Sequence, residues 1–207
     1  INKGAGSKIQ STRVGVGHVW EINTHLKNTT TVFYSSVNHD RIADKAFEVS
    51  TSPNIGFRTV FQHNYQWGDF TNQIDFGAEV QDSKSQISNY RFSGTNPANP
   101  MEMSPLSKGS YFKYNNNQSN YFAVERLTYQ PWQLTFLAGV SFNRINYDRT
   151  DLLAYQGLVA GYTNNLSFSK DFKTVATPHF ALQKSWRSHI FNISYSEGYN
   201  APTASSA

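Results

Sequence analysis

Several features that often reveal a protein's class are scarce or missing in this sequence. None of its 207 residues is cysteine, which excludes a disulfide framework and any thiolate site. Charged residues make up only 15% of it, well below the roughly 25% of an ordinary soluble domain. The net charge of +4 is mild and spread along the chain. Because no basic stripe is present, we expect no nucleic-acid partner.

Long apolar runs are missing too. The longest candidate, from Trp132 to Phe142, includes Gln133 and Thr135 and falls far short of the roughly 20 residues that a membrane-spanning helix needs. The opening residues, Ile-Asn-Lys-Gly, do not precede an apolar segment, so we expect no signal peptide here. Either a signal has been removed or the sequence starts inside a longer protein.

Aromatic and uncharged polar residues are plentiful instead. The sequence has 12 Tyr and 15 Phe, while Asn, Ser, Thr and Gln lower the mean hydropathy to −0.54. This mixture is expected where apolar and polar positions alternate. It fits a membrane barrel that faces lipid on one side and water on the other. It also fits a secreted or surface β-sandwich for adhesion or binding, in which two apolar faces pack together.

Alternation is clearest between residues 55 and 80. Odd positions from Ile55 to Trp67 are mostly apolar or aromatic, with polar residues between them, and after a turn at 68–72 the even positions from Ile74 to Val80 continue the apolar set. Successive side chains of a strand point to opposite faces, so the pattern predicts a long hairpin with one apolar face.

We predict four hairpins in all, at about residues 13–39, 55–81, 120–147 and 173–199. Their short turns are expected near 27–29, 68–72, 130–131 and 184–187. Long extracellular loops are expected at about 40–53, 82–119 and 148–172. Short turns that alternate with long loops are typical of outer-membrane barrels. The predicted fold class is therefore all-β, an antiparallel transmembrane β-barrel of which these eight strands form part.

Tryptophans suggest how this barrel is oriented. Trp67, Trp132 and Trp186 lie beside predicted short turns, where they would form the periplasmic aromatic girdle. With the short turns in the periplasm, both ends of the sequence are expected at the outer surface. Complete small barrels keep their ends in the periplasm, so we interpret residues 1–207 as an internal piece of a larger barrel.

Three sequence elements resemble a known family. Residues 193–203, Ile-Ser-Tyr-Ser-Glu-Gly-Tyr-Asn-Ala-Pro-Thr, resemble the Y-S-x-G-[FY]-x-A-P-T segment late in the barrel of TonB-dependent outer-membrane receptors. Residues 177–182 resemble the x-P-K-x-x-L strand before it. Residues 139–148 resemble a G-x-R-x-x-x-Y-D strand, with Ser141 in place of the arginine. The motif residues are Ser196, Gly198, Tyr199, Pro202 and Thr203.

The resemblance covers about residues 120–207, and the earlier part agrees only in its rhythm of strands and loops. It implies a 22-stranded barrel filled by a plug domain that this sequence does not show. It also implies uptake of a scarce nutrient, by default a ferric siderophore or similar iron chelate. The implied partners are outer-membrane lipid, that nutrient and the TonB energy-coupling complex. No cofactor and no enzymatic activity are expected.

Aromatic and cationic residues in the predicted long loops are the candidate ligand contacts, because aromatic faces and cations suit an anionic iron chelate or a sugar. They are Tyr90, Arg91, Lys108, Tyr111, Tyr114, Tyr155 and Tyr162, with Phe112 and Lys113 nearby. Packing of loop against loop is the alternative interpretation. Arg58, Asp75 and Glu79 are expected to line the inner wall.

The sequence gives little support for a metal site or a catalytic site. The six histidines have no metal-ligand spacing. Residues 4–8 lack the spacing and helix of a phosphate-binding loop. An outer-membrane barrel enzyme remains an alternative that would need a cluster such as His39, Asp148 and Asp151 at the outer rim.

Overall fold

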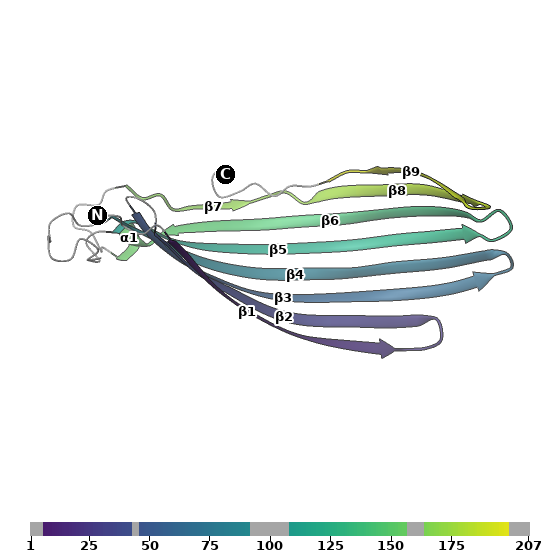
Figure 1. The fold of residues 1–207 in the computed structure, drawn as a ribbon, viewed down its shortest axis with the longest axis horizontal. Coiled ribbons are helices and arrows are strands. Elements are labelled where there is room, and N and C mark those ends of the chain that lie inside the picture. The colour runs from purple at the N-terminus through teal and green to yellow at the C-terminus, as the bar shows by residue number, and fades with distance from the viewer. Residues whose placement is uncertain (1–5, 43–45, 92–107, 157–163, 199–207) are drawn as a thin grey trace.

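The computed structural model describes residues 6–42, 46–91, 108–156 and 164–198. Within them the chain forms one antiparallel sheet and one short helix (Figure 1). The elements are β1 (Gly6–Glu21), β2 (Leu26–Ile42), β3 (Ala46–Trp67), β4 (Phe70–Arg91), β5 (Lys108–Tyr129), β6 (Leu134–Asp151), α1 (Leu152–Gln156), β7 (Phe168–Asp171), β8 (Val175–Trp186) and β9 (His189–Ser196).

Consecutive strands are neighbours in the sheet. The order is β1-β2-β3-β4-β5-β6-β8-β9, and β7 pairs with the far end of β6. All pairs are antiparallel. Figure 1 shows a long curved sheet whose four short turns gather at one end. The predicted all-β barrel wall is therefore confirmed as an open section of such a wall.

The first turn differs from its predicted position at 27–29. It lies at residues 22–25, between β1 and β2. The Asn23 side-chain oxygen accepts the backbone N–H groups of His25 at 2.8 Å and Leu26 at 2.9 Å, which is the local bonding that makes Asn a turn residue. Asn28 instead donates across the sheet to Thr59 Oγ1 at 2.9 Å.

The strands are also longer than the alternation predicted. β3, β4 and β5 have 22 residues each, so much of the expected loops at 40–53, 82–119 and 148–172 is strand. Polar side chains pair across the sheet there: Asn89 Nδ2 donates to Ser110 Oγ at 2.9 Å and Ser83 Oγ to Asn54 Oδ1 at 2.8 Å. Asn and Ser, which are typical of loops, can thus occupy these strands because side chains of the neighbouring strand form hydrogen bonds with them.

The sheet has two chemically different faces. One, the apolar face, carries Val32, Phe57 and Val80 in register across β2, β3 and β4. Large side chains on it are exposed: Phe57 is 42% accessible, Phe76 43% and Ile193 71%. The opposite, polar face carries residues such as Arg58 and Glu79. Polar side chains interrupt this face at a few positions, such as Glu125, to which Asn72 donates at 2.6 Å. Such exposure of a largely apolar face is expected where lipid replaces a packed core.

An aromatic belt runs along the short-turn end. Trp67 stacks on Phe70 with ring centroids 5.4 Å apart, Phe70 lies 4.9 Å from Tyr129, and Tyr129 lies 5.6 Å from Trp132. The rings connect the second and third hairpins. They form the girdle that the tryptophans predicted at this end.

Glycine permits two close approaches on the polar face. A Cβ added to Gly56 would clash with the Phe33 ring, and one added to Gly77 would clash with the Thr59 carbonyl oxygen. The Phe33 ring therefore covers Gly56, a pairing that fills the gap a glycine leaves in a sheet.

A small core lies at the other end, beside α1. Ile145, Leu152 and Leu153 are the buried apolar residues of the described part of the chain.

No described helix has the length and apolar character to cross a membrane.

Candidate functional site

On the apolar face, large apolar side chains are concentrated in the part of the strands next to the short turns. We call this part the apolar band. On β4 it extends from Phe70 to Val80, and on β6 from Leu134 to Phe142. Beyond it the same face carries polar residues such as Asp82 and Arg144. A tilted strand needs about 9–11 residues to cross a bilayer, so the far ends of the strands extend well past the membrane.

The predicted ligand contacts divide between the two faces of these far ends. Tyr90, Lys108 and Tyr111 lie on the side of the apolar face, with Tyr90 paired with Lys108 at a register shift. Tyr114 lies on the polar face, paired with Arg149. One candidate set therefore becomes two separate groups.

The first group is an outer cluster of Phe47, Tyr90, Lys108 and Tyr111. The Lys108 ammonium lies 3.8 Å from the Tyr111 ring centroid and 5.4 Å from that of Tyr90. Phe47 and Tyr90 have centroids 6.3 Å apart. Cation–π attraction holds the ammonium between the rings. This cluster faces away from the interior that the polar face lines.

The second group, which we call the rim cluster, lies on the polar face. Its members are Phe112, Tyr114, Tyr147, Arg149 and Phe168. Tyr114 and Tyr147 have centroids 5.8 Å apart, and Tyr147 and Phe168 5.7 Å. Three elements, β5, β6 and β7, bring the five side chains together. They form a concentration of aromatic surface with one fixed cation.

Arg149 occupies the middle of the rim cluster. Its guanidinium carbon lies 4.5 Å from the Phe168 ring centroid and 5.2 Å from that of Phe112. Its Nε donates to the Leu166 carbonyl at 2.8 Å. One nitrogen is thus bound by the chain itself, while the planar group is held between two rings.

Asp151 anchors the segment behind this cluster. It is fully buried, and its carboxylate accepts the backbone N–H groups of Leu153 at 3.0 Å and Leu166 at 3.3 Å. Its own N–H donates to Ser167 Oγ at 2.8 Å. These bonds begin α1 and fix the residues that precede β7. A pairing of Asp148 with Asp151 is excluded, since positions three apart in a strand face opposite sides.

The phenols of the rim cluster stay protonated at neutral pH. Burial raises the pKa of Tyr147 to about 12, with a further rise from Tyr114, against the opposing effect of Arg149. Burial also raises the pKa of Tyr114, again opposed by Arg149. Both hydroxyls are therefore neutral donors beside a permanent cation, which is suitable for binding an anion.

Sequence reasoning missed Tyr147, Arg149 and Phe168 as a group. The prediction ended a hairpin at 147 and placed residues 148–172 in a loop, whereas β6 continues to Asp151. Extending the alternation by four positions would have placed Tyr147 and Arg149 on one face.

Other predicted residues have mixed outcomes. Arg91 ends β4 and Tyr155 lies in α1, but their side chains, like all of Tyr162, lie outside the described residues. Ser196 ends β9 opposite His179, and Gly198 follows it. Tyr199, Pro202 and Thr203 lie outside the described residues.

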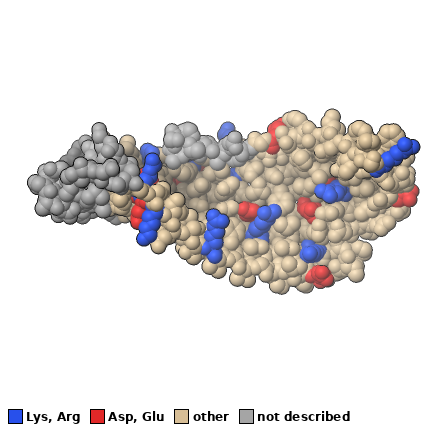
Figure 2. Space-filling view, in the orientation of Figure 1, with Lys and Arg blue, Asp and Glu red and all other residues tan. Residues whose placement is uncertain are grey.

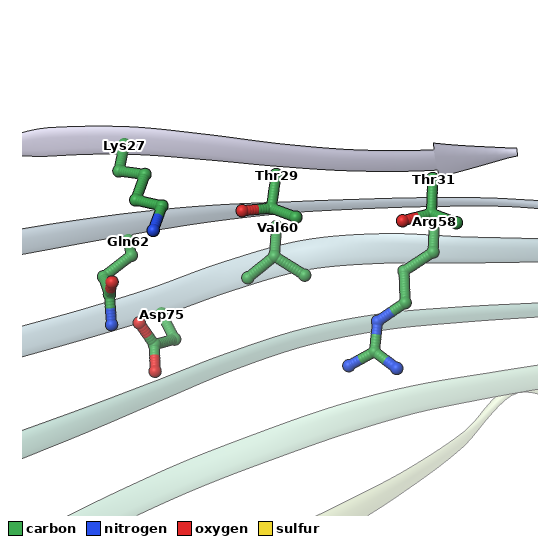
Figure 3. Close-up of a pocket in the computed structure, with 7 residues that line it drawn as sticks. All are labelled: Lys27, Thr29, Thr31, Arg58, Val60, Gln62 and Asp75. Atoms are coloured by element: carbon green, nitrogen blue, oxygen red, sulfur yellow. The ribbon is translucent and has the colours of Figure 1, made fainter. Parts of the chain in front are cut away.

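Nearer the short turns, the polar face holds a pocket of about 450 Å³ (Figure 3). Its lining includes Lys27, Gln62 and Asp75, whose side chains point toward one another in the figure. Asp75 Oδ2 accepts from Gln73 at 2.9 Å, while its buried Oδ1 has no hydrogen-bond partner among the described residues. Arg58, which also lines the pocket, forms an ion pair with Glu79 at 3.5 Å. The predicted wall residues therefore share this face.

Charges on the visible face are scattered rather than gathered. Figure 2 shows blue and red side chains lying singly or in mixed pairs over the sheet. In the described part of the chain, no three His, Asp or Glu residues are grouped to hold a metal ion.

Comparison with known proteins gives one family. Residues 2–207 match the family described as "TonB dependent receptor-like, beta-barrel". No curated protein sequence matches.

Solved structures share the fold at low identity. The alcaligin outer-membrane receptor FauA from Bordetella pertussis is 11% identical, with a TM-score of 0.70 over 93% of this chain and 29% of that one. The open form of the ferric-catecholate import receptor Fiu from E. coli K12 is 10% identical, with a TM-score of 0.70 over 94% and 36%. The siderophore receptor PiuA from Acinetobacter baumannii is 9% identical, with a TM-score of 0.66 over 87% and 31%. The chain thus spans about a third of each.

Proposed function

Because the chain belongs to the TonB-dependent receptor β-barrel family, we propose that its parent protein takes up a scarce nutrient across the bacterial outer membrane. The proposed ligand is an anionic iron chelate such as a ferric siderophore. Residues 1–207 supply a section of the barrel wall, and the rim cluster supplies part of the outer ligand site. The protein is a receptor and transporter in this proposal, and no catalytic step is assigned to it.

The position of the rim cluster is the observation that carries the proposal. It lies on the polar face, which lines the barrel interior, and at the end opposite the short turns, which face the periplasm in such barrels. A ligand that enters from outside meets this surface before it reaches the membrane-spanning part of the wall.

The chemistry of the cluster suits an iron chelate. Chelates with catecholate, hydroxamate or carboxylate groups present oxygen atoms with negative charge beside apolar or aromatic surface. Arg149 supplies a cation, Tyr114 and Tyr147 supply neutral hydroxyl donors, and the rings supply flat apolar contact area. Ferric catecholate and alcaligin are named as ligands of proteins with the same fold, which supports this class.

The polar wall below offers the next surface along the interior. The pocket with Lys27 and Asp75 and the Arg58–Glu79 pair lies between the rim cluster and the short turns. Passage along it requires rearrangement of the plug that fills such barrels, with energy from the TonB complex. Both belong to the proposal for the whole receptor.

Uptake of radioactive iron tests the proposal. Cells that lack their other iron-chelate receptors would carry the full-length receptor or an empty vector. They would be supplied with iron-55 as citrate, a catecholate chelate or a hydroxamate chelate. We expect receptor-dependent uptake of at least one chelate, and its abolition in cells without TonB. Equal uptake with the empty vector for every chelate would contradict the proposal.

A further inference from the structure

We propose that a groove in the apolar band binds an aminophospholipid of the periplasmic leaflet, with Glu125 on β5 as the partner of its ammonium group. The groove has a volume of about 550 Å³ and lies on the lipid-facing side of the sheet. Its lining is apolar except for Glu125, and it includes Ile74, Ala123, Ala138, Val140, Pro178 and Phe180. The groove and the rim cluster are on opposite faces, so the proposal does not depend on the identity of the nutrient.

Register places the carboxylate at the end of the groove nearer the short turns. Glu125 pairs with Ile74 on one side and with Ala138 on the other. The next row of outward residues, farther from the short turns, consists of Phe76, Ala123, Val140 and Pro178. Larger side chains flank the two rows, with Leu127 and Phe136 toward the turns and Tyr121 and Phe142 away from them. The groove is therefore a hollow that short side chains leave between larger ones.

An acidic side chain is unexpected on this surface. Glu125 is exposed, and a charged group that faces lipid has no water to solvate it. Asn72 Nδ2 donates to Glu125 Oε1 at 2.6 Å, and Asn72 itself is only 5% accessible. Among the residues that the structure describes, no cation forms an ion pair with Glu125. One hydrogen bond holds the carboxylate in place, so a cation that balances its charge must come from the lipid side.

Height within the membrane identifies the leaflet. A strand tilted by about 40° rises about 2.5 Å per residue along the barrel axis. The backbone of Glu125 therefore lies about 10 Å from Tyr129 of the aromatic belt, which marks the membrane boundary. The hydrogen bond to Asn72, which follows Phe70 of the belt closely, draws the carboxylate toward that boundary. Half of the hydrocarbon core is about 15 Å thick, so the carboxylate lies in the periplasmic half, within reach of that leaflet's headgroups.

A phospholipid with a primary ammonium group fits the groove and the carboxylate together. One acyl chain would fill the hollow over Ala123 and Ala138, and the ammonium would extend from the boundary to Glu125. An ammonium has three N–H donors, and a charge-assisted hydrogen bond to a carboxylate is strong where water is excluded. A trimethylammonium headgroup has the charge but no N–H donor. A phosphoglycerol headgroup has no cation and would bring its anion toward Glu125.

Competition between lipids for the purified full-length receptor tests the proposal. Native mass spectrometry would compare phosphatidylethanolamine, phosphatidylcholine and phosphatidylglycerol that carry the same acyl chains. We expect the wild type to bind phosphatidylethanolamine about fivefold more tightly than phosphatidylcholine and at least tenfold more tightly than phosphatidylglycerol. Glu125→Gln keeps the side-chain volume and an acceptor for Asn72 but removes the charge. It should lower the affinity for phosphatidylethanolamine about tenfold and leave little preference among the three lipids.

Two further variants separate the groove from the charge. Ala123→Phe fills the hollow while Glu125 remains, so it should weaken binding of phosphatidylethanolamine at least threefold. If that variant does not fold, Glu125→Gln alone decides. Asp82→Asn removes an outward carboxylate beyond the apolar band, 3.3 Å from Lys84, and should bind all three lipids like the wild type. Equal phosphatidylethanolamine affinity in the wild type and Glu125→Gln, or equal affinity of the wild type for the three lipids, would overturn the proposal. Uptake of the iron chelate is measured separately, so either proposal can fail alone.

Discussion

The two faces of the sheet carry similar side chains beyond the membrane, yet they meet different surroundings. The outer cluster and the rim cluster each combine aromatic rings with a cation. Closer to the short turns the faces diverge, with exposed Phe57 and Phe76 on one and the Arg58–Glu79 pair on the other. Residue type therefore does not assign function in this wall. The side of the strand on which a residue lies, and its distance from the short turns, are more informative, because they decide whether its side chain faces the barrel interior, the apolar band or the outward surface beyond that band.

The largest effect is expected from placing a charge in the apolar band. Phe76→Arg puts a guanidinium in the middle of the lipid-facing surface of β4, where it should cost about 2–4 kcal/mol of folding free energy. Val60→Arg, on the polar face of the adjacent strand, should change it by less than about 1 kcal/mol. Folding titrations of the full-length receptor in lipid vesicles measure both. Equal losses would show that the apolar face does not meet lipid.

Much of this contrast was predictable from the sequence, and the reason is physical. A period of two follows directly from strand geometry, so the alternation, which is clearest from Ile55 to Val80, predicted both faces. The four predicted hairpins placed three of the four turns. The far ends of the strands were not predicted as strands because apolar residues do not alternate with polar ones there. Asn54 and Asn89 are turn formers by propensity, and cross-strand hydrogen bonds stabilise them in strands. Asn54 bonds with Ser83 and Gln81, and Asn89 bonds with Ser110. Those partners are distant in sequence, so local composition could not reveal them.

The rim cluster as a whole was not predicted, for a related reason. Its five residues come from three strands, and Phe168 reaches Arg149 only because β7 returns to β6 after α1. Tyr114 was found from composition, but it was grouped with Tyr90 and Tyr111, which lie on the other side of the sheet. If the two-residue alternation had been continued through the residues typical of loops, it would have placed Tyr114 on one face and Tyr90 and Tyr111 on the other.

The next prediction contrasts two arginines of β6. Arg149→Ala removes the cation of the rim cluster and should weaken binding of the iron chelate about tenfold, or about 1.4 kcal/mol, because a charge-assisted contact is lost. Arg144→Ala, on the opposite side of the same strand and paired with Asp171 at 2.7 Å, should leave affinity unchanged. Fluorescence quenching of the purified receptor gives both constants. Loss in the Arg144 variant alone would reverse the assignment of the two sides.

A smaller effect is expected from removing one hydroxyl. Tyr147→Phe keeps the ring contacts but deletes a neutral donor, so chelate affinity should fall about threefold to tenfold. Tyr121→Phe, which changes a lipid-facing ring that is 54% exposed, should bind normally. The same titrations measure both. An unchanged affinity for Tyr147→Phe would limit the role of this tyrosine to packing against Tyr114 and Phe168.

The last effect concerns stability at high pH. Burial, with a contribution from Tyr114, raises the folded-state pKa of Tyr147 from 10.0 to about 12. Because the folded protein holds this proton more tightly than the unfolded chain, the resulting stability is fully present below about pH 10 and is lost as the pH rises toward 12. The wild-type receptor should therefore lose stability more steeply over this interval than Tyr147→Phe, while Tyr121→Phe should follow the wild type. Urea unfolding at pH 9, 10, 11 and 12 gives the slopes. Parallel curves for wild type and Tyr147→Phe would mean that water reaches the phenol as freely as in the unfolded chain, which would place the polar side of β6 in open solvent at this height.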